Sequence, residues 1–364
     1  MGDILHSLPA ITALRRAHPH WQIDWVVEPK WMPLLTAERT DEMAGIVPEG
    51  YRDPRRPVVD RVLPAAVKGW AKRPLSGGTR REILALRAEL RVGEYDAVLD
   101  LQGAVRSVGI GRMAGCRRVI GAAEPREPLA KWLYTEPVLT PEPHVIGQAA
   151  ELADAIAGDL LEVEEPWLPV DPIAEAWCEL MPGLAEAQEE GRPVVLLHPG
   201  GGWGAKRWPA ERYGVVAAEL ARRGAEVLVH AGPGDEEVLA RVVVATAGVG
   251  RAVSCSLAEL IALTRRVSLV IGGDTGPVHL ASSLGKAVVG LYGPTDPVRN
   301  GPYWPKHRVL RNPESRTDHS RRDATEAGLL TIRPEAVLDS VLGLMLEERR
   351  EAELRHAPVE EEWL

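Results

Sequence analysis

Two stretches in the second half of the chain combine glycine, hydroxyl and charged residues in an order that suits anion binding. At 200–206 the glycines let backbone N–H groups approach an anion, and Lys206 adds a positive charge. At 274–279 the chain turns into a helix whose first N–H groups are unpaired. The pair predicts a seat for phosphate, and a plain strand–turn–helix corner is the alternative for the second stretch. The residues expected at this seat are Gly200, Gly201, Lys206, Asp274, Thr275, Gly276 and His279.

Apolar runs at 193–197 and 267–271 precede these two stretches and predict buried parallel strands. Further strands are expected at 225–231 and 287–292, with a helical pattern after each of the first three strands. Regular alternation of strand and helix predicts a doubly wound α/β domain, and such domains bind ligands at the carboxyl ends of their strands.

A third candidate follows the strand expected at 225–231, where Asp235, Glu236 and Glu237 open a helix. A carboxylate at such a position can bind the hydroxyl groups of a ribose. Acidic residues also suit the positive end of a helix dipole, so both roles stay open. Together with the phosphate seat, this pattern indicates a nucleoside diphosphate ligand.

The first half of the chain shows a second α/β pattern. Its first residues have the apolar spacing of a helix, which places Asp3 near a helix N-terminus, where the dipole favours the ionised carboxylate. A simple N-terminal cap is the alternative role for Asp3. Strands are expected at 23–27, 58–63, 95–101 and 117–121, and further helices at 80–91, 104–113 and 144–157.

Three prolines among acidic residues at 162–172 mark the best candidate boundary between the two halves. We therefore expect an N-terminal domain over 1–165, a linker region over 166–190 and a C-terminal domain over 191–345. The remaining residues, 346–364, are expected to form a charged tail.

The composition is that of a globular protein of 364 residues, with 26% charged and 45% hydrophobic residues. A net charge of −9 disfavours nucleic acid as a partner. Cys116, Cys178 and Cys255 are isolated in the sequence, which predicts neither a disulfide framework nor a zinc site and fits the cytoplasm. We expect no transmembrane segment and no signal peptide, because no apolar run is long enough.

One segment departs from this acidic balance. Residues 52–91 hold eleven Lys or Arg against four Asp or Glu. The excess indicates a rim for an anionic acceptor or an anionic membrane surface, with a solvated helix face as the alternative.

Five motifs, taken in chain order, resemble those of glycosyltransferase family 9, and the resemblance extends over nearly the whole chain. The motif at 126–134 favours heptosyltransferase type I of this family over type II. The five motifs are 1–9 (MGDILHSLP), 100–107 (DLQGAVRS), 126–134 (REPLAKWLY), 206–209 (KRWP) and 274–280 (DTGPVHL).

The resemblance implies a GT-B fold, in which two Rossmann-like doubly wound domains face a central cleft. It implies inverting transfer of heptose from ADP-L-glycero-D-manno-heptose to a Kdo sugar of the lipopolysaccharide inner core. The implied partners are this nucleotide-sugar donor and Kdo-lipid A at the inner face of the inner membrane. No cofactor and no obligatory metal are expected, and the chain contains no Asp-x-Asp triad.

The resemblance also gives the residues roles. Asp3 would be the base that takes the proton of the acceptor hydroxyl. Lys206 and the N–H groups of Thr275 and Gly276 would stabilise the departing ADP. Asp274 would hold the heptose hydroxyls, and Glu236, or a carboxylate one residue away in the alignment, would hold the ribose. The residues expected to contact the acceptor are His6, Gln102, Arg106 and Arg126.

Family members begin with an apolar strand of about ten residues before the Gly-Asp motif, whereas this sequence starts at the motif. We therefore expect open edges on the neighbouring strands and a less firmly held Asp3. Two alternatives follow: a family-9 transferase with another donor or acceptor, and a nucleotide-sugar-binding protein without activity.

Overall fold

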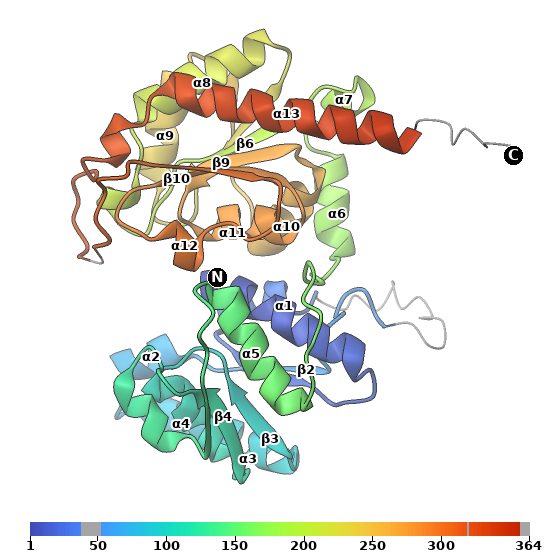
Figure 1. Ribbon diagram of the computed structural model, residues 1–364, viewed down its shortest axis with the longest axis vertical. Coiled ribbons are helices and arrows are strands. Elements are labelled where there is room, and N and C mark those ends of the chain that lie inside the picture. The colour runs from blue at the N-terminus through green and yellow to red at the C-terminus, as the bar shows by residue number, and fades with distance from the viewer. Residues whose placement is uncertain (38–51, 319, 357–364) are drawn as a thin grey trace, which may run out of the picture. The chain divides into compact units, whose positions relative to one another are not determined.

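The computed structural model describes residues 1–37, 52–318 and 320–356, and the chain divides into two compact units (Figure 1). The N-terminal unit comprises Met1–Cys178 with Cys255–Ala262, and the C-terminal unit comprises Glu179–Ser254 with Leu263–Leu364. The division after Cys178 falls within the region 166–190 that was expected to be a linker. That region contains two short helices, α6 (Pro172–Glu179) and α7 (Leu184–Glu189).

The strands of the N-terminal unit form two parallel sheets. In the first, β1 (Asp24–Val27) pairs with β2 (Arg61–Pro64); in the second, β4 (Arg118–Ala122) lies between β3 (Ala97–Asp100) and β5 (Glu136–Val138). The helices are α1 (Gly2–Ala17), α2 (Val67–Lys72), α3 (Gly77–Val92), α4 (Val105–Met113) and α5 (Val145–Ala157), with 3₁₀ turns η1 (Pro29–Leu34) and η3 (Pro128–Leu133).

Open strand edges were expected in this unit. Among the described residues, β1 has β2 as its single strand partner and β3 has β4, so the two sheets do not join. β1 and β3 therefore lie at the sides of their sheets, and the missing strand stays a prediction.

Helix α1 is buried along most of its length and packs against α5, as Figure 1 shows. Arg15 near its end is 1% exposed, because its guanidinium donates to the Val58 carbonyl oxygen at 2.8 Å and to Asp60 Oδ2 at 2.5 Å. A buried cation with such partners fixes the end of α1 against the chain leading into β2.

The C-terminal unit contains one six-stranded parallel sheet with the order β11-β10-β9-β6-β7-β8. Helices α8, α9 and α13 cover one face and α10 and α11 the other (Figure 1). The strands are β6 (Val194–His198), β7 (Glu226–His230), β8 (Gly250–Val253), β9 (Leu269–Gly273), β10 (Ala287–Tyr292) and β11 (His307–Arg311). The helices are α8 (Ala210–Arg222), α9 (Glu236–Ala245), α11 (Gly276–Ser283), α12 (Pro297–Asn300) and α13 (Pro334–His356), with 3₁₀ turns η4 (Gly204–Lys206) and η5 (Leu329–Thr331). Helix α10 (Leu257–Arg266) begins in the segment that belongs to the N-terminal unit and ends in this one.

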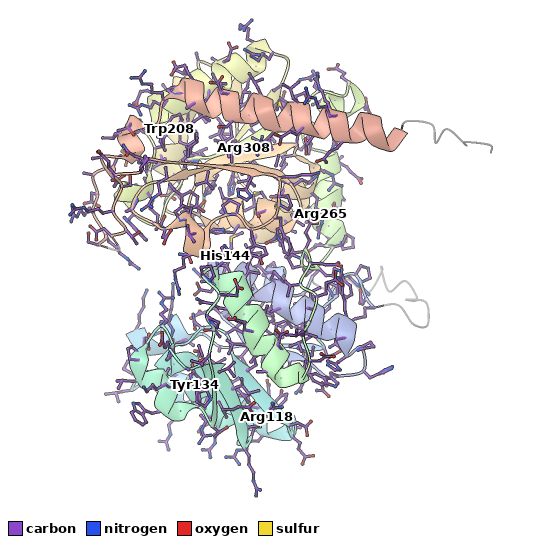
Figure 2. All side chains as sticks on the ribbon, in the orientation of Figure 1. Arg118, Tyr134, His144, Trp208, Arg265 and Arg308 are labelled. Carbon is purple, nitrogen blue, oxygen red and sulfur yellow. The ribbon has the colours of Figure 1, made fainter. Side chains whose placement is uncertain are left out.

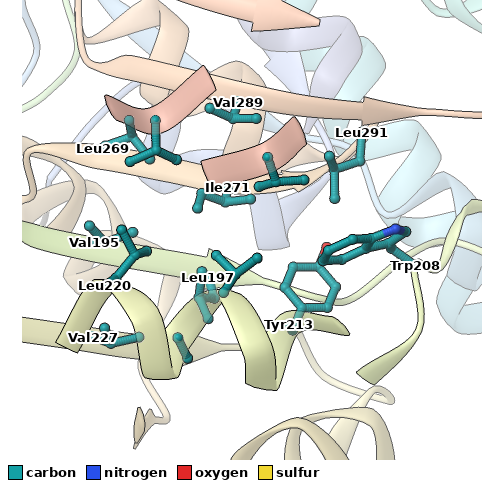
Figure 3. Close-up of a cluster of buried hydrophobic side chains, with 14 of the residues drawn as sticks. Val195, Leu197, Trp208, Tyr213, Leu220, Val227, Leu269, Ile271, Val289 and Leu291 are labelled. Atoms are coloured by element: carbon teal, nitrogen blue, oxygen red, sulfur yellow. The ribbon is translucent and has the colours of Figure 1, made fainter. Parts of the chain in front are cut away.

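The core of this unit lies between the sheet and helices α8 and α13 (Figure 3). Val195, Leu197 and Ile271 extend from the strands and are fully buried. Trp208 and Tyr213 meet edge to face with ring centroids 4.9 Å apart, so aromatic rings fill the space beside the strand ends. The apolar runs that predicted β6, β7, β9 and β10 are thus the strands of this core.

The expected boundary at 345 falls inside a continuous helix, since α13 runs from Pro334 to His356. As far as His356, the charged residues after 345 belong to this helix, and 357–364 lie outside the described residues. Glu347 pairs with Arg308, and Glu348 and Glu351 lie 4.0 Å and 3.7 Å from Lys306 Nζ. These pairs hold the helix beside β11.

Candidate active site

The chain after β9 turns directly into α11, as the sequence predicted. Thr275 is the N-cap residue and has an extended backbone. Its hydroxyl donates to the carbonyl oxygen of Gly273 at 3.2 Å and does not cap the helix. The first N–H groups of α11 therefore lack a side-chain cap, and with the helix dipole they favour an anion.

Lys206 meets Asp274 at the same place. Lys206 Nζ lies 2.5 Å from Asp274 Oδ2, and His279 Nε2 donates to Asp274 Oδ1 at 3.0 Å. All three side chains are nearly buried, with exposed fractions of 12% for Lys206, 9% for Asp274 and 6% for His279. The stretches 200–206 and 274–279, which were predicted to share a ligand, are thus joined beside the carboxyl ends of the paired strands β6 and β9.

Asp274 is ionised in these surroundings. Burial alone would raise the pKa of this carboxyl group, but the hydrogen bond from His279 and the charge of Lys206 outweigh burial and hold the pKa of Asp274 well below its usual range. The ammonium of Lys206 is therefore matched by a carboxylate. A phosphate bound here would use the N–H groups of α11 as well as Lys206.

The stretch 200–206 is held closely by the chain at 322–326. Ala205 donates from its N–H to the Arg322 carbonyl oxygen at 2.9 Å and accepts from the N–H of Glu326 at 3.2 Å. Gly204 packs so tightly that a β-carbon on it would lie 1.7 Å from the Asp323 carbonyl oxygen. On the other side, Lys206 Nζ lies 4.4 Å from the ring centre of Trp203.

The carboxylate that contacts the glycines is Asp235 and not Glu236. The N–H of Gly201 donates to Asp235 Oδ2 at 3.2 Å, and Arg207 forms an ion pair with Asp235 Oδ1. Glu236 is exposed and accepts from the N–H of Gly234 at 2.9 Å. Hydrogen bonds from the backbone N–H groups of Gly234 and Glu236 lower the pKa of the Glu236 carboxyl, against a smaller opposing effect of burial. A ribose-binding role for Glu236, or for its neighbour Asp235, stays a prediction.

Two histidines beneath the glycines were not singled out from the sequence. His198 ends β6 and His230 ends β7, and their Nδ1 atoms lie 3.2 Å apart. Each residue is 4% exposed. Burial lowers the pKa of His198 to about 3, with a smaller effect from His230, and burial lowers that of His230 to about 4. The sequence did show a histidine at the end of each of these strands. That the two strands are neighbours, and so bring the histidines together, is known only from the strand order.

The N-terminal unit brings together three of the residues expected there. Asp3 lies in the first turn of α1, and its Oδ2 accepts from Gln102 Nε2 at 3.3 Å. Arg126 Nη1 lies 3.6 Å from the same oxygen. The side chains of Asp3 and Arg126 are 60% and 63% exposed, so this ion pair is open to water.

A buried pair positions Gln102 from below. Tyr134, labelled in Figure 2, donates its hydroxyl to Asp100 Oδ2 at 2.7 Å, and Asp100 Oδ1 accepts from the N–H of Gln102 at 3.0 Å. Gly103 has a φ of 64°, and a β-carbon there would lie 2.9 Å from the nitrogen of Arg126. The segments after β3 and β4 therefore run close enough to place Gln102 beside Arg126.

The other two expected acceptor residues are His6 and Arg106. His6 is on α1 and meets the ring of His144 edge to face, with centroids 5.9 Å apart. Arg106 is exposed in the first turn of α4.

The described residues contain neither a metal-binding cluster nor a membrane-spanning helix. Within the ranges 1–37, 52–318 and 320–356, no group of three or more His, Cys, Asp or Glu could hold a metal ion. In the same part of the chain, none of the helices combines the length and hydropathy needed to cross a bilayer.

Comparison with known proteins defines the class. The model of glycosyltransferase family 9 (heptosyltransferase) matches residues 83–329. The protein is thus a transferase of the glycosyltransferase class, with an α/β fold of parallel sheets. The chain belongs to glycosyltransferase family 9, as its motifs indicated.

Individual relatives agree with this assignment. The chain is 29% identical over 350 residues to lipopolysaccharide heptosyltransferase 1 of Escherichia coli K12, which covers 94% of this chain and 97% of the relative. It is 30% identical over 319 residues to the protein of the same name from E. coli O18:K1:H7, with coverage of 86% and 89%.

A solved structure, the E. coli heptosyltransferase WaaC with ADP, superimposes with a TM-score of 0.71 at 25% identity, covering 94% of this chain and 97% of that one. The same enzyme with ADP-2-deoxy-2-fluoro heptose gives a TM-score of 0.69. The expected GT-B class is confirmed by these neighbours.

Proposed function

We propose that this protein transfers heptose from ADP-L-glycero-D-manno-heptose to a Kdo sugar of the lipopolysaccharide inner core, with inversion at the anomeric carbon. Curated relatives that match nearly the whole chain are lipopolysaccharide heptosyltransferases, and the solved E. coli heptosyltransferase WaaC holds ADP in one structure and ADP-2-deoxy-2-fluoro heptose in another. The observation that carries the proposal is the ion pair between Lys206 and Asp274, because it joins the two stretches that resemble the family's donor motifs.

In this proposal the C-terminal unit binds the donor. The diphosphate lies against the uncapped N–H groups at Thr275 and Gly276, with Lys206 supplying charge, and Gly200 and Gly201 allow close approach. As the glycosidic bond to ADP breaks, negative charge grows on the leaving phosphate, and these fixed groups stabilise it. Asp274 accepts hydrogen bonds from heptose hydroxyls.

The ribose partner in the proposal is Asp235, since Glu236 is exposed and engaged with Gly234. His279 keeps Asp274 oriented through its hydrogen bond. No cofactor or obligatory metal is part of the proposal.

The N-terminal unit would bind the acceptor. Asp3 takes the proton of the attacking Kdo hydroxyl, which makes that oxygen a better nucleophile. Arg126 and Gln102, which already contact Asp3, would orient it and meet the carboxylate of Kdo. His6 and Arg106 complete the proposed acceptor contacts.

We place the protein at the cytoplasmic face of the inner membrane, as a peripheral protein that reaches Kdo-lipid A. The excess of Lys and Arg at 52–91 supports this location, because lipid A and the membrane surface are anionic. Exposed apolar side chains such as Leu75 and Trp132, 99% and 78% exposed, would suit the same surface.

The experiment is a transfer assay with ADP-heptose and Kdo-lipid A, in which Asp3→Asn and Asp3→Ala are compared with the parent chain. Removal of a general base should lower kcat by about 10²–10⁴. ADP affinity, measured by calorimetry, should stay unchanged. The control Asp96→Asn alters an exposed carboxylate at the other end of β3 and should leave both quantities as they are.

The assay also separates the alternatives. Full activity of Asp3→Asn would remove Asp3 from the mechanism. Intact ADP-heptose binding with no transfer by the parent chain would favour a binding protein, which the exposure of Asp3 makes a real alternative. Transfer to other acceptors, or from other nucleotide sugars, would favour a different member of the family.

A further inference from the structure

A basic hollow lies in the C-terminal unit at the amino ends of the strands, opposite the carboxyl ends where the donor site is proposed. Its lining comes from residues directly before three strands: Ser268 before β9, Lys286 before β10 and Lys306 before β11. In a parallel sheet these amino ends face away from the carboxyl ends where 200–206 and 274–279 meet. The hollow has a volume of about 450 Å³, which is larger than one phosphate group needs.

Its lining is strongly cationic. Arg265 and Arg266, at the end of α10, also line the hollow, and Arg265 is labelled in Figure 2. Basic residues at a helix C-terminus have a structural explanation in the helix dipole. Lys286 lies two residues beyond Leu284, the C-cap of α11, so the dipole of that helix also favours its charge. Lys306 lies in the loop before β11 and has no such explanation. One carboxylate, that of Glu348, completes the charged lining.

The two lysines differ in their partners. Lys306 Nζ lies 4.0 Å from Glu348 and 3.7 Å from Glu351, at the long end of the range for an ion pair. Lys286 is half-buried, and no carboxylate of the described residues lies within 4.0 Å of its ammonium. Burial, helped by the charge of Lys306 and opposed by that of Glu348, lowers the pKa of Lys286. The lining of the hollow thus holds four cations and one carboxylate in a protein of net charge −9. Arg266 and Lys306 have carboxylate partners, whereas Lys286 has none among the described residues within 4.0 Å.

A doubly charged anion between the two ammonium groups would relieve this imbalance. A phosphate monoester carries about −1.5 to −2 at neutral pH and has three strong acceptor oxygens. The Ser268 hydroxyl and the Gln188 amide also line the hollow and can donate to such oxygens. The remaining volume leaves room for the group to which the phosphate is attached.

We propose that the hollow between Lys286 and Lys306 is a binding site for a phosphate monoester, distinct from the nucleotide site at the other edge of the sheet. The ligand is either a free metabolite that carries this group or a lipid headgroup that presents it. The proposal does not depend on the identity of the sugar that the protein transfers.

The test uses two probes on the full chain. Glycerol 3-phosphate, titrated by calorimetry, stands for the free anion, and phosphatidylcholine vesicles with 20% phosphatidic acid, assayed by co-sedimentation, present the same group on a surface. The variants are Lys286→Gln, Lys306→Gln and the pair of them. Arg349→Gln, which removes an exposed cation from the same end of α13, is the matched control. Lys206→Met reports on the donor site.

Each single lysine change should weaken binding about five- to tenfold, since each removes one charge-assisted hydrogen bond. The double variant should abolish binding, while Arg349→Gln and Lys206→Met bind as the parent does. The variants of Lys286, Lys306 and Arg349 should keep their melting temperature within about 2 °C. Binding of glycerol 3-phosphate identifies a free ligand; binding of the vesicles alone identifies a headgroup.

Three results would overturn the proposal: no binding of either probe by the parent chain, equal binding by the double variant, or loss of binding in Lys206→Met. The last result would assign the anion to the donor site. Heptose transfer is assayed separately, so a failure of this proposal leaves the proposed function untouched.

Discussion

Two ion pairs, one in each unit, differ sharply in their surroundings. Lys206 and Asp274 lie 2.5 Å apart with 12% and 9% of their side chains exposed. Asp3 and Arg126 lie 3.6 Å apart with 60% and 63% exposed. Both pairs join residues that were predicted to contact substrate. The contrast is therefore between a buried ion pair at the proposed donor site and an exposed one at the proposed acceptor site.

The buried pair is part of the folded structure, because neither charge can lose its partner without a large desolvation cost. It fixes the donor stretches before any ligand arrives. The exposed pair contributes little to stability and its partners can separate at little cost. Asp3 and Arg126 can therefore change partners when a ligand binds, which suits the role of base proposed for Asp3.

The largest effect on stability is expected when one member of the buried pair is removed. Asp274→Ala leaves the Lys206 ammonium buried without its carboxylate, and we expect a loss of about 3–5 kcal/mol in the free energy of unfolding. Urea denaturation measures it. The double change Asp274→Ala with Lys206→Met should recover part of the loss; if it is no better than the single change, the loss does not come from the unpaired charge.

Acid should act on the same region next. Folding lowers the pKa values of His198 and His230 to about 3 and 4, below the value near 6.5 of an unfolded histidine, so the unfolded chain binds protons first. Their contribution is complete above pH 6.5 and falls as the pH drops. Between pH 6 and 5 the free energy of unfolding should decrease by about 2 kcal/mol.

The acid effect is checked by urea denaturation at several pH values. The variant His198→Gln with His230→Gln should show a flatter dependence over this range, whatever its stability at pH 7. Asp235 also lies in this region, because its Oδ2 and the Nε2 of His198 lie 2.7 Å and 3.1 Å from the position of a β-carbon on Gly200. An unchanged slope in the double variant would assign the acid sensitivity to other groups.

The affinity for ADP tests the proposed role of Lys206 in the buried pair. Lys206→Met keeps the length of the side chain but removes its charge, and we expect ADP to bind about tenfold more weakly, the loss of one charge-assisted hydrogen bond. Calorimetry with ADP measures the change. Arg222→Met removes an exposed cation of α8 and serves as control; equal weakening in both variants would indicate a long-range charge effect.

The smallest effect belongs to the exposed pair. Asp3→Ala and Arg126→Ala should each change the free energy of unfolding by less than about 0.5 kcal/mol. Urea denaturation at low and high salt checks this, and a loss above 1 kcal/mol would show that the exposed pair is structural after all.

The sequence predicted the elements better than the contacts between them. Strands β6, β7, β9 and β10 were predicted because their buried apolar runs leave little alternative. Strand β11 was missed because HRVLR is half-buried along its whole length and has no apolar run. The end of α13 was missed because its charged residues suit both a tail and an exposed helix face.

The candidate site was predicted in part for the same reason. Its glycines, hydroxyls and carboxylates stand at strand ends, which a one-dimensional pattern can reveal. The pairing of Lys206 with Asp274 depends on β6 lying beside β9, and the contact of His198 with His230 on β6 lying beside β7. Strand order is a property of the folded sheet, so the residues that touch across it could not be found from spacing.

The close packing of Gly204 against the chain at Asp323 links two segments more than a hundred residues apart. Ala205 exchanges backbone hydrogen bonds with this chain at Arg322 and Glu326. The amide protons of Ala205 and Glu326 should therefore exchange with deuterium as one cooperative unit. A nucleotide that reduces the mobility of the turn at 200–206 should then also slow amide hydrogen exchange around residue 326. Exchange at residue 326 would therefore measure binding at the proposed donor site.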